Sequence, residues 1–495
     1  MIRHFRKAHT MAAKTYSDAV NALNTLQSNF ATIDAIRKSG GKANNQAIPE
    51  MLEWARRCGY QPSDFNRLNM IHVTGTKGKG STCAFVQGML NQLKGAPSCG
   101  KVSKIGLYTS PHLKSVRERI CIDGAPISEE KFAKYFFELW DRLSASKSDT
   151  GEFPTFGEDI KPVYFRYLTL LSFHVFLQEG VDTAIYEVGV GGEYDSTNII
   201  EKPTVTGVSP LGIDHTFMLG NTIEEIAWNK GGIFKPGAAA FSVSQPESAL
   251  KVLKERAAER NAPFEEVSVR PDIASGEVKL GLPAEFQKIN ASLAVALVGE
   301  HIRVLTDGKG VIPEGSTLPK EYITGLAESK WAGRCQTIQQ GNIRWLLDGA
   351  HTKESVTVAG EWLQQVKKTS DTKSKTILFF NQQTRDANAL LGTLHENLGD
   401  VKIDEALFST NVTWASGTYS ADLTSLNTSA EAVDKLEVQK ELAKVWESLD
   451  GGKSTVFATI EEAVNCVKKE AEAGPVDVFV VGSLHLIGGV LTVIE

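Results

Sequence analysis

The stretch His72–Thr82, HVTGTKGKGST, has the glycines, lysine and hydroxyl residue of a phosphate-binding loop, but in an unusual spacing. The common P-loop has four residues between its first glycine and a Gly-Lys pair, followed directly by Ser or Thr. Here two residues separate Gly75 from the Gly78-Lys79 pair, and a further glycine precedes Ser81. A strand-like run before the loop and a helix-prone run after it would let backbone N–H groups, a helix N-terminus and the lysine hold an anion. The alternative is a glycine-rich turn with a solvated lysine. The four glycines, Lys79, Ser81 and the setting between a strand and a helix together favour phosphate binding.

Acidic, histidine and lysine side chains follow other strand-like runs. Glu187 ends a hydrophobic run, and a carboxylate at the C-terminal end of a parallel strand faces the crevice where α/β proteins bind ligands such as Mg²⁺. His215 and Lys230 share a downstream segment, and Asp348 and His351 stand together in LDGAHT. Each has a plainer interpretation: a strand-end glutamate held by backbone N–H groups, a structural histidine, a solvated lysine, and a helix N-cap for Asp348.

The bulk composition bounds the class of protein. The chain has 495 residues, more than one hydrophobic core usually serves, so we expect two domains. A net charge of −6 argues against a general nucleic-acid binder, and no apolar stretch has the length of a membrane span. The six cysteines form no C-x-x-C pair, which favours a reducing compartment.

The first residues, MIRHFRKAHTMAAKTY, are basic, with no acid before Asp18. This composition is typical of a mitochondrial presequence, here residues 1–14, and the alternative is a disordered basic tail. Met11 is a possible second start that omits most of it. We therefore expect a mitochondrial form that starts at Met1 and a cytoplasmic form that starts at Met11.

Short β-branched runs alternate with amphipathic helical patterns, which argues for mostly parallel sheets covered by helices. Helices are expected at 129–143 and 163–177, and strands at Met70–Val73, Ile105–Tyr108, Thr183–Val188, Thr204–Val208 and Ala240–Val243. The pattern starts again near Trp331, with strands in RWLLDGAH, KTILFFN, EALFST and VDVFVVGS. We therefore place one α/β domain at residues 15–330 and a smaller one at 331–495, with loops at 144–159 and 411–429.

Several long motifs occur in order and together resemble the folylpolyglutamate synthase family of the Mur ligase superfamily. Beside the glycine-rich loop, they are YTSPHLKSVRERI, YEVGVGGEYDSTN, GIDHTFMLGNTIEEIAWNKGGI, WAGR, LDGAHT and VVGSLHLIGGVL. The stretches DGAHTKES and LFFN look like the eukaryotic branch. The resemblance runs from about Thr15 to the C-terminus. It implies a P-loop ATPase domain with a mostly parallel sheet, followed by a smaller Rossmann-like α/β domain that binds glutamate.

The resemblance also implies a role for each matching residue. The ATP phosphates would be held by Gly78, Lys79, Gly80 and Ser81, and ATP would further contact Asn290 near the adenine, Arg334 and Asp348. Mg²⁺ would be ligated by Ser110, Glu187 and His215, and a carbamylated Lys230 would bridge a second ion. The incoming glutamate would lie near His351 and Ser483, and the candidate catalytic residues are Lys79, Lys230 and His351. A monovalent cation such as K⁺ is a further expected cofactor.

This chain departs from the family pattern at a few positions. Asn229 stands before Lys230 where an acidic residue is common, and Gly231 replaces the usual alanine. The linker reads WAGR where WPGR is common, and Asn381–Asp386, NQQTRD, stands where NATGDRD is more usual. None of these changes removes a group assigned to chemistry, but Asn229 bears on the carbamylation of Lys230.

The activity implied is ATP-dependent addition of L-glutamate to the γ-carboxylate of tetrahydrofolate polyglutamates through an acyl phosphate, with release of ADP and phosphate. One alternative is dihydrofolate synthase on the same scaffold, alone or combined with this activity. A second is a nucleotide-switch binding protein, which would leave Arg334, Asp348 and His351 without a role. We expect a monomer that binds no nucleic acid.

Overall fold

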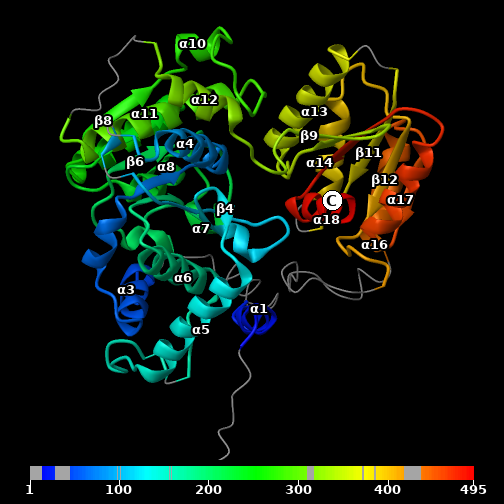
Figure 1. Ribbon diagram of the computed structural model, residues 1–495. Helices are drawn as coiled ribbons and strands as arrows, with labels where there is room; N and C mark the ends of the chain where they lie inside the picture. Colours follow the sequence, from blue (N-terminus) through cyan, green and yellow to red (C-terminus); the bar gives the residue numbers. More distant parts are fainter. Residues whose placement is uncertain are drawn as a thin grey trace, which may run out of the picture.

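The computed structural model describes residues 14–27, 45–96, 99–100, 102–154, 156–157, 159–308, 317–370, 373–383, 386–416 and 436–495. Two mostly parallel sheets, each covered by helices, form two α/β domains (Figure 1), and the expected fold class is confirmed. The predicted presequence lies outside the described residues except for Lys14, as does Met11. None of the helices in these ranges is long and apolar enough to cross a membrane.

The first domain is built on a sheet with the strand order β4-β3-β2-β5-β1-β6-β7-β8. The strands are β1 Ile71–Thr74, β2 Ile105–Tyr108, β3 Ile120–Ile122, β4 Ala125–Pro126, β5 Thr183–Glu187, β6 Val205–Val208, β7 Ala239–Val243 and β8 Phe264–Val267. Only β2–β3 and β3–β4 are antiparallel among these pairs. The sequence pattern finds five of the strands and misses three, because β3 and β4 are very short and β8 exposes two glutamates.

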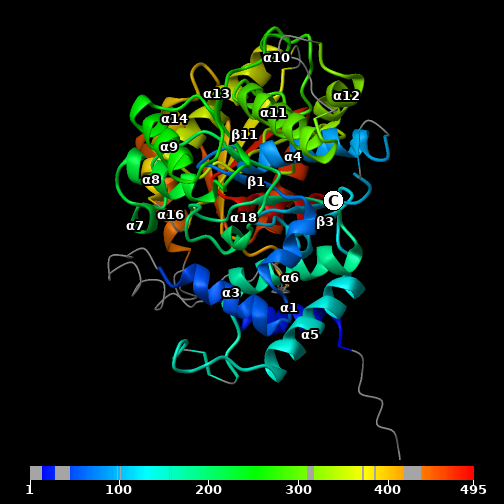
Figure 2. The ribbon, with the colours of Figure 1, turned by 90° about the vertical axis from the view of Figure 1, so that its left-hand side faces the viewer.

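Alternate residues of the central strand β5 enter two different cores, as the two-residue period of a strand requires. Ala184 and Tyr186 pack in one cluster with α1 Tyr16–Asn24, α3 Ala47–Arg57, α5 Glu129–Ala145 and α6 Tyr164–Glu179. Ile185 packs in the other with α4 Lys79–Leu93, α11 Gln287–Leu305 and α12 Lys320–Glu328. The two groups of helices cover opposite faces of the sheet (Figures 1 and 2). The remaining segments are η1 Pro62–Leu68, η3 Val116–Arg119, η4 Ser196–Ile199, α7 Thr216–Leu219, α8 Ile223–Lys230, η5 Gly231–Ile233, α9 Glu247–Glu259 and α10 Pro271–Ala274.

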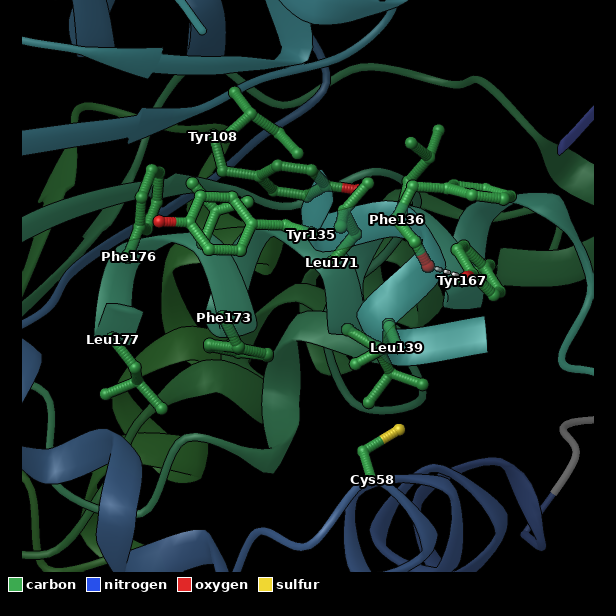
Figure 3. Close-up of a cluster of buried hydrophobic side chains, with 14 of the residues drawn as sticks. Cys58, Tyr108, Tyr135, Phe136, Leu139, Tyr167, Leu171, Phe173, Phe176 and Leu177 are labelled. Atoms are coloured by element: carbon green, nitrogen blue, oxygen red, sulfur yellow. Dashed lines mark hydrogen bonds between the residues drawn. The ribbon is translucent and has the colours of Figure 1, made fainter. Parts of the chain in front are cut away.

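Aromatic packing fixes α5 and α6 against the strands that lead to the site (Figure 3). The rings of Phe136 and Tyr167 lie 4.8 Å apart, and the Tyr167 hydroxyl donates to the Phe136 carbonyl at 2.8 Å. Phe173 stacks on Tyr186 at 4.8 Å, and Tyr186 in turn contacts Tyr108. Such pairs add to the free energy gained by burial and hold the rings in defined geometry. Packing against α6 therefore holds the C-terminal ends of β2 and β5 in place.

The second domain is built on a sheet with the strand order β13-β12-β11-β14-β10-β9. Its strands are β9 Gln336–Gln340, β10 Ile343–Leu347, β11 Lys375–Phe380, β12 Glu405–Ser409, β13 Ser454–Phe457 and β14 Val476–Val481, with only β9 antiparallel to its neighbour. Its helices are α13 Lys353–Lys368, α14 Ala387–Glu396, α16 Glu437–Ser448, α17 Ile460–Glu470 and α18 Leu484–Ile494. The four predicted strands are present, whereas the partly exposed edge strands β9 and β13 escape the pattern.

The two domains are joined by the chain between α12 and β9, the segment that contains the predicted boundary near Trp331. They also touch through Leu113, which packs in the apolar cluster of the second domain. A Cβ added to Gly488 of α18 would lie 2.0 Å from the Leu113 carbonyl oxygen, so the glycine makes room for this contact. Lys114 pairs with Glu495 beside it. Of the predicted loops, α5 extends into the first to Ala145, and much of the second, from residue 417, lies outside the described residues.

Two fully buried histidines of the first domain bear on its stability in acid. His301 of α11 bonds through Nδ1 to Thr204 Oγ1 at 2.8 Å, and His72 of β1 bonds through Nε2 to Thr197 Oγ1 at 2.8 Å. Burial lowers the pKa of each to about 3. Both rings are therefore neutral in the folded protein at neutral pH.

We predict that the free energy of unfolding falls as the pH drops below about 6.5, the ordinary histidine pKa. Between that pH and the folded-state pKa of about 3, the unfolded chain binds the proton and the folded chain does not, so protonation favours unfolding. His301→Gln should reduce the pH slope of the urea midpoint, by an amount equivalent to about 1.4 kcal/mol per pH unit. The range from about pH 4 to about pH 6 lies inside that window. If His301→Gln has the same slope as the parent over this range, this account is contradicted.

Candidate active site

The phosphate loop runs from β1 to α4, and two of its glycines stand where a side chain cannot. Gly75 has φ +148°, and a Cβ added there would lie 1.9 Å from Ser209 Oγ. Gly78 has φ +79°, and its Cβ would lie 2.3 Å from Asn290 Oδ1. Glycine adopts such backbone angles without steric cost. The loop can therefore follow its tight path only with glycine at both positions.

The end of β6 clamps the loop from one side. The backbone N–H groups of Thr76 and Lys77 both donate to the Pro210 carbonyl at 3.0 Å. Ser209 Oγ donates to the Lys77 carbonyl at 2.6 Å, and Thr76 Oγ1 donates to the Gly212 carbonyl at 3.1 Å. These bonds fix the loop's shape in the protein itself, as a preorganised anion site requires.

Helix α4 begins directly at the loop. Its N-cap is Gly78, which has no side chain to accept a bond from the first turn, and that turn carries no acidic residue. The first N–H groups of a helix have no partners within the helix and, with the helix dipole, attract anions. A Cβ on Gly80 would lie 3.0 Å from Trp331 Nε1, so the linker indole packs on this end of the helix. The N-terminus of α4 thus has the chemistry predicted for it.

Two lysines donate to one carbonyl of the loop. Lys79 Nζ lies 3.1 Å and Lys230 Nζ lies 2.7 Å from the Gly75 carbonyl oxygen. Burial lowers the pKa of Lys230 well below its ordinary range, and the Lys79 ammonium lowers it further, against the opposing effects of Asp214 and Asp195. Burial disfavours the charged amine. A lowered pKa raises the fraction of neutral amine, which is the form that can react with CO₂.

Glu187, at the end of β5, is buried, with 5% of its surface exposed. Its Oε2 accepts a bond from the Ser110 backbone N–H at 3.1 Å. Burial raises the pKa of Glu187, while Lys79, the Ser110 N–H and Arg334 oppose the rise. A carboxylate kept from bulk water beside these donors is poised to accept a cation.

Three of the four predicted magnesium ligands, Glu187, Ser110 and His215, line one cavity. Lys230 does not line this cavity and instead donates to the Gly75 carbonyl of the loop. His215 is exposed, has φ 51°, and its backbone N–H donates to Asp214 Oδ1 at 2.9 Å. Within the described ranges, no three His, Cys, Asp or Glu side chains form a metal cluster. Mg²⁺ commonly takes one or two protein oxygens and completes its shell with water and phosphate oxygens, so the oxygens of Glu187 and Ser110 fit an ion bound with a nucleotide.

Asn229, the departure next to Lys230, has a clear structural role. Its Oδ1 accepts the Gly192 backbone N–H at 3.1 Å, and its carbonyl accepts the Glu193 N–H at 2.7 Å. A Cβ on Gly192 would lie 2.7 Å from the Asn229 carbonyl oxygen, so the two segments touch. An amide oxygen accepts this bond as a carboxylate would, without placing a negative charge beside the Lys230 amine.

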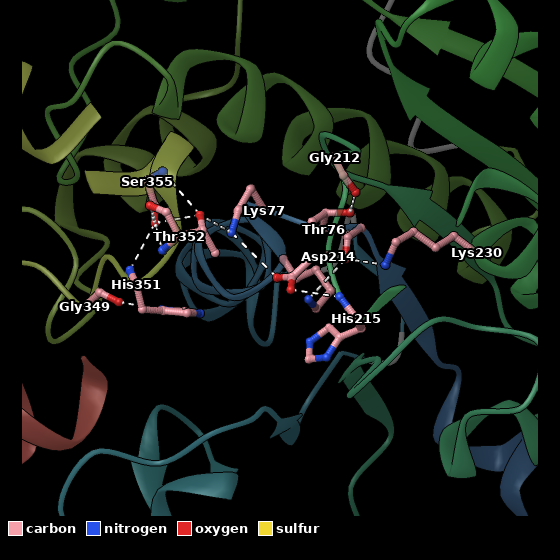
Figure 4. Close-up of polar contacts among 12 residues, drawn as sticks. Thr76, Lys77, Gly212, Asp214, His215, Lys230, Gly349, His351, Thr352 and Ser355 are labelled. Atoms are coloured by element: carbon pink, nitrogen blue, oxygen red, sulfur yellow. Dashed lines mark hydrogen bonds and ion pairs between the residues drawn. The ribbon is translucent and has the colours of Figure 1, made fainter. Parts of the chain in front are cut away.

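Sequence reasoning assigned no role to three residues that lie in or against the loop. The first is Ser209, which bonds to the loop as described above. The second is Gln287 of α11, whose Nε2 donates to Ser81 Oγ of α4 at 3.1 Å and whose Oε1 accepts from Asn290 Nδ2 at 2.9 Å. The structure thus places Asn290, predicted to lie near adenine, against Gly78 of the loop. The third group is Lys77, whose ammonium crosses to the second domain (Figure 4).

The predicted groups of the second domain lie around the linker. Both oxygens of Asp348 accept backbone N–H groups, from Cys335 at 2.8 Å and from Ala350 at 2.9 Å, and burial raises the Asp348 pKa while Arg334 opposes the rise. His351 Nδ1 contacts the Gly349 carbonyl at 2.8 Å. The N-cap interpretation of Asp348 is wrong, because Thr352 is the N-cap of α13; Ser483 is the N-cap of α18.

One cavity of about 1080 Å³ unites these groups. Its walls carry every predicted site residue except Lys230: Gly78, Lys79, Gly80, Ser81, Ser110, Glu187, His215, Asn290, Arg334, Asp348, His351 and Ser483. It therefore joins a phosphate loop of one domain to polar groups of the other, which is the arrangement of an enzyme that brings a nucleotide and a second substrate together.

Comparisons with known proteins agree with this arrangement. A family model described as the C-terminal domain of dihydrofolate synthetase matches residues 332–493. The folylpolyglutamate synthase of Saccharomyces cerevisiae is 54% identical over 491 residues, which cover 98% of this chain and 88% of that protein.

Two solved structures are similar over most of the chain. Folylpolyglutamate synthase of Mycobacterium tuberculosis, complexed with ADP and AMPPCP, has a TM-score of 0.68 at 22% identity and covers 90% of this chain and 94% of that one. FolC of E. coli, in complex with DHPP and ADP, has a TM-score of 0.66 at 24% identity and covers 98% of both chains. At these identities the likeness shows the fold.

Proposed function

The chain belongs to the folylpolyglutamate synthase family, and on that premise we propose that it adds L-glutamate to the γ-carboxylate of tetrahydrofolate polyglutamates at the expense of ATP. The observation that carries the proposal is the shared cavity. Its lining includes Lys79 and the N-terminus of α4 as well as Arg334, His351 and Ser483 of the linker and second domain. A binding protein that only hydrolyses a nucleotide would leave Arg334, His351 and Ser483 without a role.

The chemistry needs an activated carboxylate, because oxide is too poor a leaving group for direct amide formation. One oxygen of the γ-carboxylate attacks the γ-phosphorus of ATP, and the bond to the β–γ bridging oxygen breaks with release of ADP. The glutamate amine then attacks the acyl phosphate carbon, loses a proton, and expels phosphate that carries the former carboxylate oxygen. The cavity would exclude water from this intermediate, which would otherwise hydrolyse.

The residues of the chain contribute mainly positioning and charge, as phosphoryl transfer requires. Lys79 and the first N–H groups of α4 would hold the phosphates, and Arg334 would balance charge from the linker side. His351 and Ser483 would bind the incoming glutamate. Magnesium held by Glu187 and Ser110 would neutralise phosphate charge when bound with the nucleotide.

We predict that the ligand-dependence of ADP release distinguishes the candidate functions. The parent should release ADP over repeated turnovers only when a tetrahydrofolate and L-glutamate are added together, because with the tetrahydrofolate alone each site forms ADP once and then holds the acyl phosphate until an amine attacks it. Lys79→Ala should abolish ligation with an unchanged circular dichroism spectrum. ADP release without either substrate would support the nucleotide-switch alternative, and near-normal turnover by Lys79→Ala would reject the phosphate-loop assignment.

Dihydrofolate synthase remains the second candidate, because the matching family model is named for that activity. It uses the same activation but takes dihydropteroate as the carboxylate. Replacing tetrahydrofolate by dihydropteroate in the same assay separates the two activities. Formation of dihydrofolate would add this reaction to the proposed one, or replace it if tetrahydrofolate is inert.

We further propose that Lys230 is carbamylated. The amine lies in a buried site, where it shares the Gly75 carbonyl with Lys79, and its lowered pKa raises the fraction of the neutral form that carbamylation needs. Lys230→Ala should be nearly inactive and partly rescued by acetate, which places a carboxylate in the vacated space. Lys230→Arg should not be rescued, because its side chain fills the space and keeps its charge. Substantial activity in Lys230→Arg would show that only a positive charge is needed.

We propose that the protein acts in both mitochondria and cytoplasm through starts at Met1 and Met11. The basic leader without acids motivates this proposal. Met11→Leu should deplete the cytoplasmic form and spare the mitochondrial one, as measured by fractionation and N-terminal sequencing. An unchanged distribution would contradict the two-start proposal.

A further inference from the structure

One side chain of the phosphate loop reaches across the cavity to the second domain. Lys77 Nζ donates to Thr352 Oγ1 at 2.9 Å and lies 3.8 Å from Asp214 Oδ2 (Figure 4). Thr352 is the N-cap of α13, and Asp214 lies between β6 and α7. The ammonium of Lys77 therefore connects three segments that are distant in sequence.

Both ends of this connection are held in place. The Lys77 backbone is bonded on both sides, its N–H to Pro210 and its carbonyl to Ser209. Thr352 forms a capping box with Ser355, whose Oγ also accepts the backbone N–H of His351 at 3.1 Å. The loop thus fixes the backbone from which the Lys77 side chain extends, and the turn that carries His351 fixes the position of its acceptor.

The connection is separate from the apolar contact between the domains. Leu113 and Lys114 meet α18 near the C-terminus, whereas Thr352 begins α13. Ala284 of the first domain also packs in an apolar cluster of the second domain, together with Val356 and Ala359 of α13. The bond between Lys77 and Thr352 adds a polar contact at the N-terminus of the same helix, and it further restricts rotation of the domains about the linker.

We propose that Lys77 is a positioning residue, which ties the phosphate loop to the N-terminus of α13 and so sets the spacing between the loop and His351. This inference rests on the proposed function for its kinetic consequence: glutamate meets the acyl phosphate only when the two domains are correctly spaced. Lys77 acts through Thr352 and is not a phosphate ligand, a role that Lys79 fills.

The test is a double-mutant cycle with Lys77→Met, Thr352→Val and both together. Each single change removes the bond and should raise the KM for L-glutamate on the order of tenfold, the usual effect of losing a hydrogen bond to a charged group. The double variant should be no worse than the worse single, since the two changes break one interaction. Lys77→Arg and Thr352→Ser should retain most activity, and the Kd for ATP should stay within about twofold in every variant.

Two matched controls separate this role from general damage. Thr459→Val removes the equivalent N-cap and capping box from α17 of the same domain, and Lys254→Met removes an exposed lysine of α9. Both should leave the KM for glutamate unchanged. Small-angle X-ray scattering of the ligand-free protein should show a larger radius of gyration in Lys77→Met and Thr352→Val than in the parent and the controls.

Three results would overturn the proposal: loss of ATP affinity in Lys77→Met but not in Thr352→Val, additive effects in the double variant, or an equal effect of Thr459→Val. If the parent makes no folylpolyglutamate at all, the proposed function fails instead. The scattering measurement and the ATP titration need no turnover, so they still decide whether Lys77 holds the domains.

Discussion

The structure of the site depends on the Gly75 carbonyl, to which both Lys79 and Lys230 donate. Two ammonium groups at one acceptor repel each other, and burial makes the repulsion stronger. Burial and the neighbouring Lys79 lower the pKa of Lys230 well below its ordinary range, which lessens this repulsion. At the end of β5, which pairs with β1 beside the loop, burial raises the pKa of Glu187 because its charge is poorly solvated. In the proposed function, a polyphosphate and a magnesium ion supply the counter-charges that these groups lack.

The two domains turn this charged loop into a place for a ligation. The linker packs Trp331 on Gly80, and Leu113 inserts into the second domain, so groups of both domains face one cavity. In the proposed function, the loop activates the carboxylate and the second domain binds the amine. A reactive acyl phosphate between them needs correct spacing and exclusion of water, which is why contacts far from the phosphates bear on the reaction.

Sequence reasoning reached the fold class, the parallel core strands and the identity of the loop. Buried runs such as Ile343–Leu347 have a clear apolar signal, whereas edge strands such as Phe264–Val267 are partly polar and short. The glycine pattern revealed the loop because steric constraints fix those positions. The partners of the loop, Ser209 and Gln287, gave no such signal. Each is an ordinary polar residue in the sequence, and its acceptor lies more than a hundred residues away along the chain.

The most direct test of the account follows the oxygen atoms of the reaction. A tetrahydrofolate with ¹⁸O in both oxygens of its γ-carboxylate is incubated with the protein, ATP and L-glutamate, and the released phosphate is examined by ³¹P NMR. The account predicts that each phosphate released with product carries one ¹⁸O, because that oxygen joined the phosphorus in the acyl phosphate. Product formed with unlabelled phosphate would contradict activation of the carboxylate by phosphoryl transfer.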